Sequence, residues 1–168
     1  MGAQVRYVFE DILGIRKVRE DRAGRECTER RAAMEQAYAY VDQCGLELEK
    51  YRVWRIEEKD RLYDQIINHE VLMIDLDELK ATLAALDEKE VLYLRRLNVG
   101  EAAAEDAKKA YESAVLAWRR SQVNLQKMEE HKDVWMEEAH EELTRLEDLE
   151  MEEHVTKRLG GLGEELDY

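Results

Sequence analysis

Glu137-Glu138-Ala139-His140 is the stretch of the sequence whose residue types and spacing best match a metal-binding pattern. The Glu-x-x-His spacing puts a carboxylate and an imidazole on one helix face, as in helical di-iron proteins. Such a site needs a second Glu-x-x-His and two further glutamates on neighbouring helices. No other histidine has a glutamate three residues before it: His69, His131, His154. We therefore predict neither a metal site nor any other cofactor, and a di-iron enzyme remains an alternative only if metal co-purifies.

The two cysteines are the next candidates for chemistry, and their spacing argues against it. Cys27 and Cys44 are 17 residues apart, which is roughly 25 Å along one helix and too far for a disulfide. Both occupy apolar positions of a helical pattern, so we predict buried free thiols of the kind kept reduced in a cytoplasm. The sequence contains no glycine-rich phosphate loop, no Gly-x-Ser-x-Gly and no Cys-x-x-Cys. We predict no catalytic residue and a protein that is not an enzyme.

The composition points to the elements that would have to position any functional residue. The 168 residues include no proline and only 8 glycines, while 39% are charged and 7% aromatic. Such a mixture is typical of long helices and coiled coils. The net charge of -14 repels nucleic acids and anionic lipid surfaces. No apolar stretch is long enough to insert into a membrane, and the N-terminus has no apolar run resembling a signal peptide.

Apolar residues follow a heptad over about eleven repeats of the second half. The a positions are Leu76, Leu83, Glu90, Leu97, Ala104, Tyr111, Trp118, Leu125, Lys132, Ala139 and Leu146. The d positions are Leu79, Leu86, Tyr93, Gly100, Ala107, Ala114, Ser121, Met128, Trp135, Glu142 and Leu149. The first half has a weaker pattern, interrupted by charged residues such as Glu20 and Arg55.

We predict an all-α fold, a long antiparallel two-helix coiled-coil hairpin with unequal arms. Residues 1–168 would form a single elongated domain, with helix 1 over 9–66, a turn at 67–70, helix 2 over 71–158 and a flexible acidic tail over 159–168. Asn68 favours the turn because asparagine ends or caps helices. A second helix of this length would extend about 130 Å. The heptad also runs through residue 69 without a skip, so one unbroken helix in a parallel homodimer is the alternative.

In the hairpin, helix 1 begins near Phe9 and would leave residues beyond about 130 as a lone helix. That stretch still has an apolar stripe that begins at Val134 and predicts a partner-binding face. The predicted contact residues in it are Trp135, Met136, Ala139, Leu143, Leu146 and Leu149. The alternatives are that Val5, Tyr7, Val8 and Phe9 fold along the stripe, or that the chain self-associates.

Two segments resemble a known family. Tyr7-Val8-Phe9-Glu10-Asp11-Ile12-Leu13-Gly14-Ile15-Arg16-Lys17 continues into Arg19, Asp21, Arg22 and Ala23, and His131-Lys132-Asp133-Val134-Trp135-Met136-Glu137-Glu138-Ala139 follows near the end. Both are similar to the YscO-type proteins of bacterial type III secretion systems, relatives of the flagellar FliJ family. The sequence departs from that pattern in its strong acidity and in having Val8 and Asp11 where prolines are often found.

The resemblance implies a non-enzymatic central stalk of the export apparatus in the bacterial cytoplasm, at the cytoplasmic face of the secretion apparatus. Its implied partners are the secretion ATPase, which it would bind and stimulate, the export gate protein and secretion chaperones. The N-terminal segment then joins the predicted contact residues: Ile12, Arg16, Lys17, Arg19, Arg22. The alternative function is a generic cytoplasmic coiled-coil tether acting as a homodimer.

Overall fold

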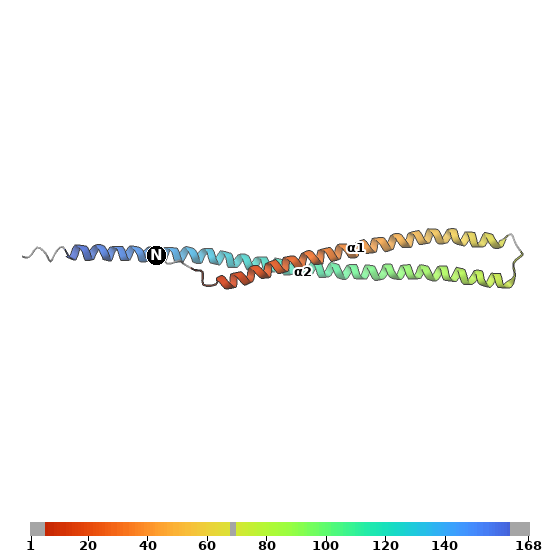
Figure 1. Ribbon diagram of the computed structural model, residues 1–168, viewed down its shortest axis with the longest axis horizontal. Helices are drawn as coiled ribbons and strands as arrows, with labels where there is room; N and C mark the ends of the chain where they lie inside the picture. The colour runs from red at the N-terminus through yellow and green to blue at the C-terminus, as the bar shows by residue number, and fades with distance from the viewer. Residues whose placement is uncertain (1–5, 68–69, 162–168) are drawn as a thin grey trace, which may run out of the picture. The chain divides into compact units, whose positions relative to one another are not determined.

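The computed structural model describes residues 6–67 and 70–161, and they form two helices (Figure 1). Helix α1 is Glu10–Ile67 and α2 is Met73–Gly161. With 58 and 89 residues, the two arms are unequal, and the described residues contain no strand. The predicted all-α hairpin is confirmed. The unbroken single helix is wrong, because residues 70–72 are not helical.

The local sequence explains where both helices begin. Glu10 and Asp11 lie in the first turn of α1, where negative charge interacts favourably with the helix dipole. At the start of α2, the Leu72 amide donates to Asp75 Oδ2 at 3.0 Å, and the Asp75 amide donates to the Leu72 carbonyl at 3.1 Å. This reciprocal pair is a capping arrangement that satisfies amides without a partner inside the helix. Asn68, predicted to make the turn, lies outside the described residues.

The chain forms two compact units, each with a stretch of both helices. One unit contains residues 24–117 and the other contains residues up to 23 together with those from 118 onwards. Helix α2 extends to Gly161, three residues beyond its predicted end at 158, and residues 162–168 lie outside the described part. The single elongated domain stays a prediction.

In the unit of residues 24–117, the buried side chains follow the heptad. They lie at seam positions of both helices: Cys27, Cys44, Leu48, Tyr51, Ala104, Ala114. Both cysteines are free. At Gly100 an added Cβ would meet the Tyr40 ring at 3.4 Å and Val41 at 3.5 Å, so a small residue lets α1 approach closely here. The helix continues through Gly100, as its position in the heptad predicts.

A polar layer interrupts the same seam. Glu90, at an a position, accepts from Arg52 Nε at 2.8 Å and also pairs with Arg55. Its side chain is only 15% exposed, so both arginines offset the cost of burying the carboxylate. Hydrogen bonding to Glu90 raises the pKa of Arg52. Lys59 donates to Asp87 at 2.7 Å and lowers the pKa of that carboxyl.

Tyr51 lies next to this layer and joins the helices by stacking and by a hydrogen bond. Its ring stacks on Tyr93 with centroids 4.9 Å apart, and its hydroxyl donates to the Leu86 carbonyl at 2.8 Å. Burial raises the pKa of this hydroxyl, because the phenolate would lose its hydration. Since Tyr51 and Glu47 contact residues 86–96 in reverse order, the helices in this unit are antiparallel.

Candidate partner-binding surfaces

All predicted contact residues fall in one unit, the one that contains residues 6–23 and 118–161. Here the first turns of α1 pack antiparallel against α2, and α2 continues beyond the start of α1 (Figure 1). The N-terminal motif and the segment around Trp135 therefore belong to the same packed structure. The heptad pattern alone did not predict the contact between these two segments, because the pattern is weak in the first turns of α1.

Tyr7 is at the centre of an aromatic cluster and is only 2% exposed. Its hydroxyl is hydrogen-bonded to Nδ1 of His131 at 2.6 Å. Its ring lies 5.4 Å from that of Trp135 and 5.8 Å from that of Phe9, both in edge arrangements. Such edge contacts add to the apolar area that each ring buries. The segment before α1 therefore packs along α2 and covers part of Trp135.

This packing corrects the predicted boundary of the lone helix. Residues beyond about 130 were expected to be unpaired, but Tyr7 and Phe9 contact His131 and Trp135. The expectation failed because it counted only residues of helix 1 and left out the non-helical residues before it. Trp135, Met136 and Ala139 are half-buried. The alternative in which N-terminal residues fold along the stripe is confirmed for Tyr7, whose ring contacts Trp135. Phe9 contacts His131, Val8 is 70% exposed, and Val5 lies outside the described residues.

Two polar contacts fix the alignment of α1 and α2 in this unit. Lys132 Nζ donates to both carboxylate oxygens of Glu10, at 3.0 and 2.7 Å. Trp118 Nε1 donates to Glu20 Oε1 at 2.7 Å. Both contacts use charged residues at seam positions, where a buried charge needs a partner. Because each has a polar partner on the other helix, Glu20 and Lys132 can occupy positions in the apolar seam while α1 and α2 remain packed.

The outer face of the first turns of α1 combines exposed apolar and basic side chains. We call it the basic face and define it as Ile12, Ile15, Val18, Arg19 and Arg22. Ile15 is 52% exposed and Val18 64% exposed. Among the described residues, no carboxylate lies within ion-pair distance of Arg19 or Arg22. The surface therefore has apolar area for contact and two arginines without an ion-pair partner among residues 6–67 and 70–161.

Ile15 and Val18 were not predicted as contact residues. Sequence reasoning selected the segment through its motif and its arginines, whereas these two side chains are identified by their exposure. Their spacing of three residues, off the seam of α1, was the available signal. The other two predicted cations lie elsewhere. Arg16 is half-buried at the edge of the seam, and Lys17 pairs with Glu129 at 4.0 Å.

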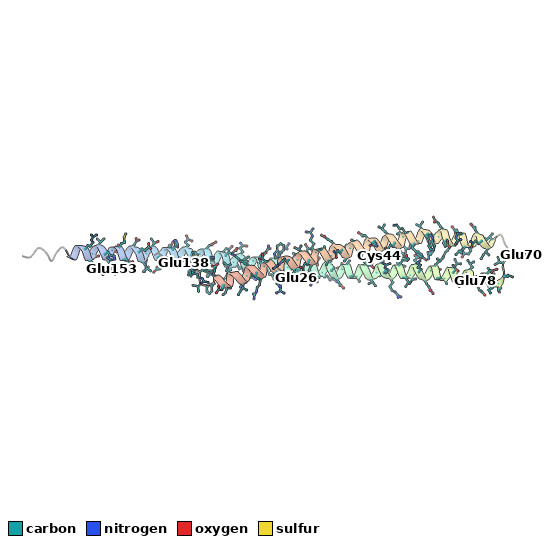
Figure 2. All side chains as sticks on the ribbon, viewed as in Figure 1. Glu26, Cys44, Glu70, Glu78, Glu138 and Glu153 are labelled. Carbon is teal, nitrogen blue, oxygen red and sulfur yellow. The ribbon has the colours of Figure 1, made fainter. Side chains whose placement is uncertain are left out.

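The α2 residues beyond the aromatic cluster form the second surface. We call residues 139–158 the overhang. Leu143 is half-buried, whereas Leu146 and Leu149 are 47% and 48% exposed. The stretch has seven acidic and three basic residues, and Figure 2 labels Glu138, just before it, and Glu153 within it. The only ion pairs within it join helical neighbours, Arg145 to Glu142 and Lys157 to Glu153. The overhang thus presents apolar side chains with an excess of negative charge.

The residues of the metal-binding pattern lie at the surface of α2. Glu137 and His140, the residues of the metal-binding pattern, are exposed. Over residues 6–67 and 70–161, no group of three or more His, Cys, Asp or Glu side chains is arranged to hold a metal ion. In the same part of the chain, neither helix has a stretch long and apolar enough to span a membrane.

Comparison with known protein families identifies the system to which these surfaces belong. The model of the type III secretion protein YscO matches residues 9–157, which is most of the chain. The chain belongs to the YscO family. The match begins within the Tyr7–Lys17 motif and extends through Trp135 and the overhang. YscO membership makes this chain a component of a type III secretion system, as its resemblance implied. No curated protein sequence matches the chain.

Two solved structures have the same fold. One is a putative YscO homologue from Chlamydia trachomatis, with a TM-score of 0.77 and 24% identity, over 98% of this chain and 100% of the other. The other is the type III secretion protein YscO of Vibrio parahaemolyticus, with a TM-score of 0.80 and 23% identity, over 86% and 91%. The YscO fold is therefore shared although few residues are identical.

Proposed function

We propose that this chain is a non-enzymatic central stalk of a bacterial type III secretion export apparatus. In this role it binds and stimulates the secretion ATPase and links it to the export gate protein or to secretion chaperones. It works in the cytoplasm, at the cytoplasmic face of the apparatus. Membership of the YscO family supports the secretion role, and two exposed apolar faces of opposite charge in one packed unit support the role in coupling.

The proposed contact residues lie on the two sides of this unit. Those on α1 are Ile12, Arg16, Lys17, Arg19 and Arg22, and those on α2 are Trp135, Met136, Ala139, Leu143, Leu146 and Leu149. Their work is mechanical: a side chain on either surface engages a partner, and the packed helix pair transmits the displacement. The ion pair of Lys132 with Glu10 helps to keep the two surfaces in a fixed relation, because it joins α1 to α2 between them.

The test measures ATP hydrolysis by the cognate secretion ATPase with and without the purified chain. We expect the chain to raise turnover and to co-purify with the ATPase. Trp135→Ala should weaken both effects while helicity measured by circular dichroism stays nearly unchanged, since tryptophans often dominate interface energies. Trp54→Ala is the matched control, because Trp54 is an exposed tryptophan outside this unit. The proposal fails if the chain neither stimulates nor co-purifies with the ATPase.

A further inference from the structure

The basic face and the overhang match each other in sequence spacing. On the basic face, Ile12, Ile15, Val18 and Arg22 follow one another at intervals of three, three and four residues. The overhang repeats these intervals 131 positions later, with three leucines and then a glutamate: Leu143, Leu146, Leu149, Glu153. Placed side by side in parallel, the two stretches put apolar residues opposite apolar residues and an arginine opposite a glutamate.

The geometry points to a second copy of this chain as the occupant of both surfaces while the chain is free of its secretion partners: the overhang of one copy packs parallel to the basic face of the other. Ile15 faces Leu146 and Val18 faces Leu149, as equivalent positions do in a parallel coiled coil. Arg22 then faces Glu153. This arrangement places the arginines of the basic face beside the overhang, which has seven acidic and three basic residues.

A single copy is unable to make this contact within itself. In one chain Glu10 lies beside Lys132 and Glu20 beside Trp118, so Ile15 lies beside α2 residues between these two. Leu146 is at least 14 residues further along α2, or at least about 20 Å. The overhang also points away from α1 of its own chain. It therefore reaches a basic face only on another copy.

The arrangement is compatible with closed two-fold symmetry. A helix that runs parallel to α1 of one copy runs antiparallel to α2 of that copy, since α1 and α2 are antiparallel. Two α2 helices related by a two-fold axis perpendicular to them are antiparallel in the same way. Each overhang then packs on the other copy, and the contact is made twice. Asp11 faces Glu142, which is unfavourable, and the same offset sets Glu10 level with Glu141 and Asp21 level with Glu152. Like charges therefore weaken the dimer at these three levels.

The first experiment measures self-association of the purified full chain by sedimentation velocity over roughly a hundredfold range of concentration. We expect a concentration-dependent dimer. Arg22→Glu and Glu153→Arg should each weaken it by about tenfold or more, and the two changes together should restore it, because the charges are exchanged. Glu142→Lys should tighten it by placing opposite charges at one of the three unfavourable levels. Arg95→Glu, an exposed site in the other unit, should have no effect.

The second experiment tests which residues of the basic face and of the overhang lie next to each other in the dimer. Ile15→Cys combined with Leu146→Cys should form a disulfide-linked dimer on mild oxidation. Ile15→Cys combined with Val155→Cys should not, since Val155 lies nine residues further along, about 13 Å. A chain that is monomeric at every concentration overturns the inference, as does a charge exchange that fails to restore the dimer. Equal crosslinking of both cysteine pairs overturns it too. Because no ATPase is present, failure here leaves the proposed stalk function untouched.

Discussion

The aromatic cluster around Tyr7 gives the sharpest test of how the N-terminal segment is held. Tyr7→Phe removes only the hydroxyl and its hydrogen bond to His131, which costs about 1 kcal/mol. Tyr7→Ala also removes the ring contacts with Trp135 and Phe9 from a side chain that is 2% exposed. Truncation of a buried aromatic ring costs about 3 kcal/mol at the lower end of the usual range, which is appropriate near a helix end.

The loss is local, because the cluster joins the start of α1 to α2 and the remaining seam is unchanged. Native-state hydrogen exchange is therefore the assay. The reporting amides are those of Glu10 and Leu13, which donate to the Tyr7 and Phe9 carbonyls at 3.3 and 2.9 Å. Since each 1.4 kcal/mol is tenfold, Tyr7→Ala should speed their exchange by roughly a hundredfold and Tyr7→Phe by roughly fivefold. Val8→Ala, at a 70% exposed position, should leave it unchanged.

Equal exchange at these amides in Tyr7→Ala and in the unaltered chain would refute the reasoning. It would mean that the cluster does not hold the first turn of α1 in solution. A uniform acceleration along all of α1 would refute it differently, by showing that the contact supports the whole unit rather than the start of the helix.

Three further predictions concern the other unit. Glu90→Gln should lower the free energy of unfolding in urea by about 1–2 kcal/mol, because its two arginines lose their charged partner, whereas the exposed control Glu88→Gln should change it by less than about 0.5. Gly45→Ala should raise it by about 1 kcal/mol, since an added Cβ meets nothing within 4 Å and alanine favours the helix. Stability should be flat near neutral pH and fall on both sides. The pKa of Asp87 is lower in the folded protein than its ordinary value of 3.8, so the ionised carboxylate stabilises the fold above pH 3.8. This stabilisation is lost as the pH falls through the pKa of the folded state, and Asp87→Asn should reduce the loss. The pKa of Tyr51 is higher in the folded protein than its ordinary value of 10.0, so the neutral hydroxyl stabilises the fold below pH 10.0. This stabilisation is lost as the pH rises through the pKa of the folded state, and Tyr51→Phe should remove the loss.

The seam of α2 was predictable because period and polarity agree there. Its a and d positions are the less exposed ones from Leu79 to Ala139, and even Glu90 was placed correctly as a charged interruption. The residues that neutralise Glu90 were harder to predict. Arg52 lies outside the seam positions recognised in α1 and reaches the carboxylate through its long side chain. A heptad pattern specifies where a residue points, but not how far a flexible cation extends.

The candidate surfaces were predictable only in part. The overhang followed from comparing helix lengths, and its exposed Leu146 and Leu149 are where the stripe placed them. The cover over Trp135 was predicted only as an alternative, because Tyr7 precedes the helix and non-helical residues have no periodicity that would fix their position. The cap formed by Asp75 was also missed, since Asn68 was the stronger turn signal in that stretch.

The polar layer at Glu90 affects how far α1 can slide along α2 when a force acts along the helices. If α1 is pulled along α2, the leucine positions of the seam offer little resistance to sliding, because Leu76 and Leu83 or Leu79 and Leu86 replace each other after a shift of one heptad, about 10 Å. Glu90 has no such equivalent: a shift of one heptad puts Leu83 or Leu97 beside Arg52 and Arg55, and the carboxylate loses both cations. Within residues 24–117, a slip of one heptad is therefore opposed by the loss of this charged layer as well as by the other polar contacts between the helices.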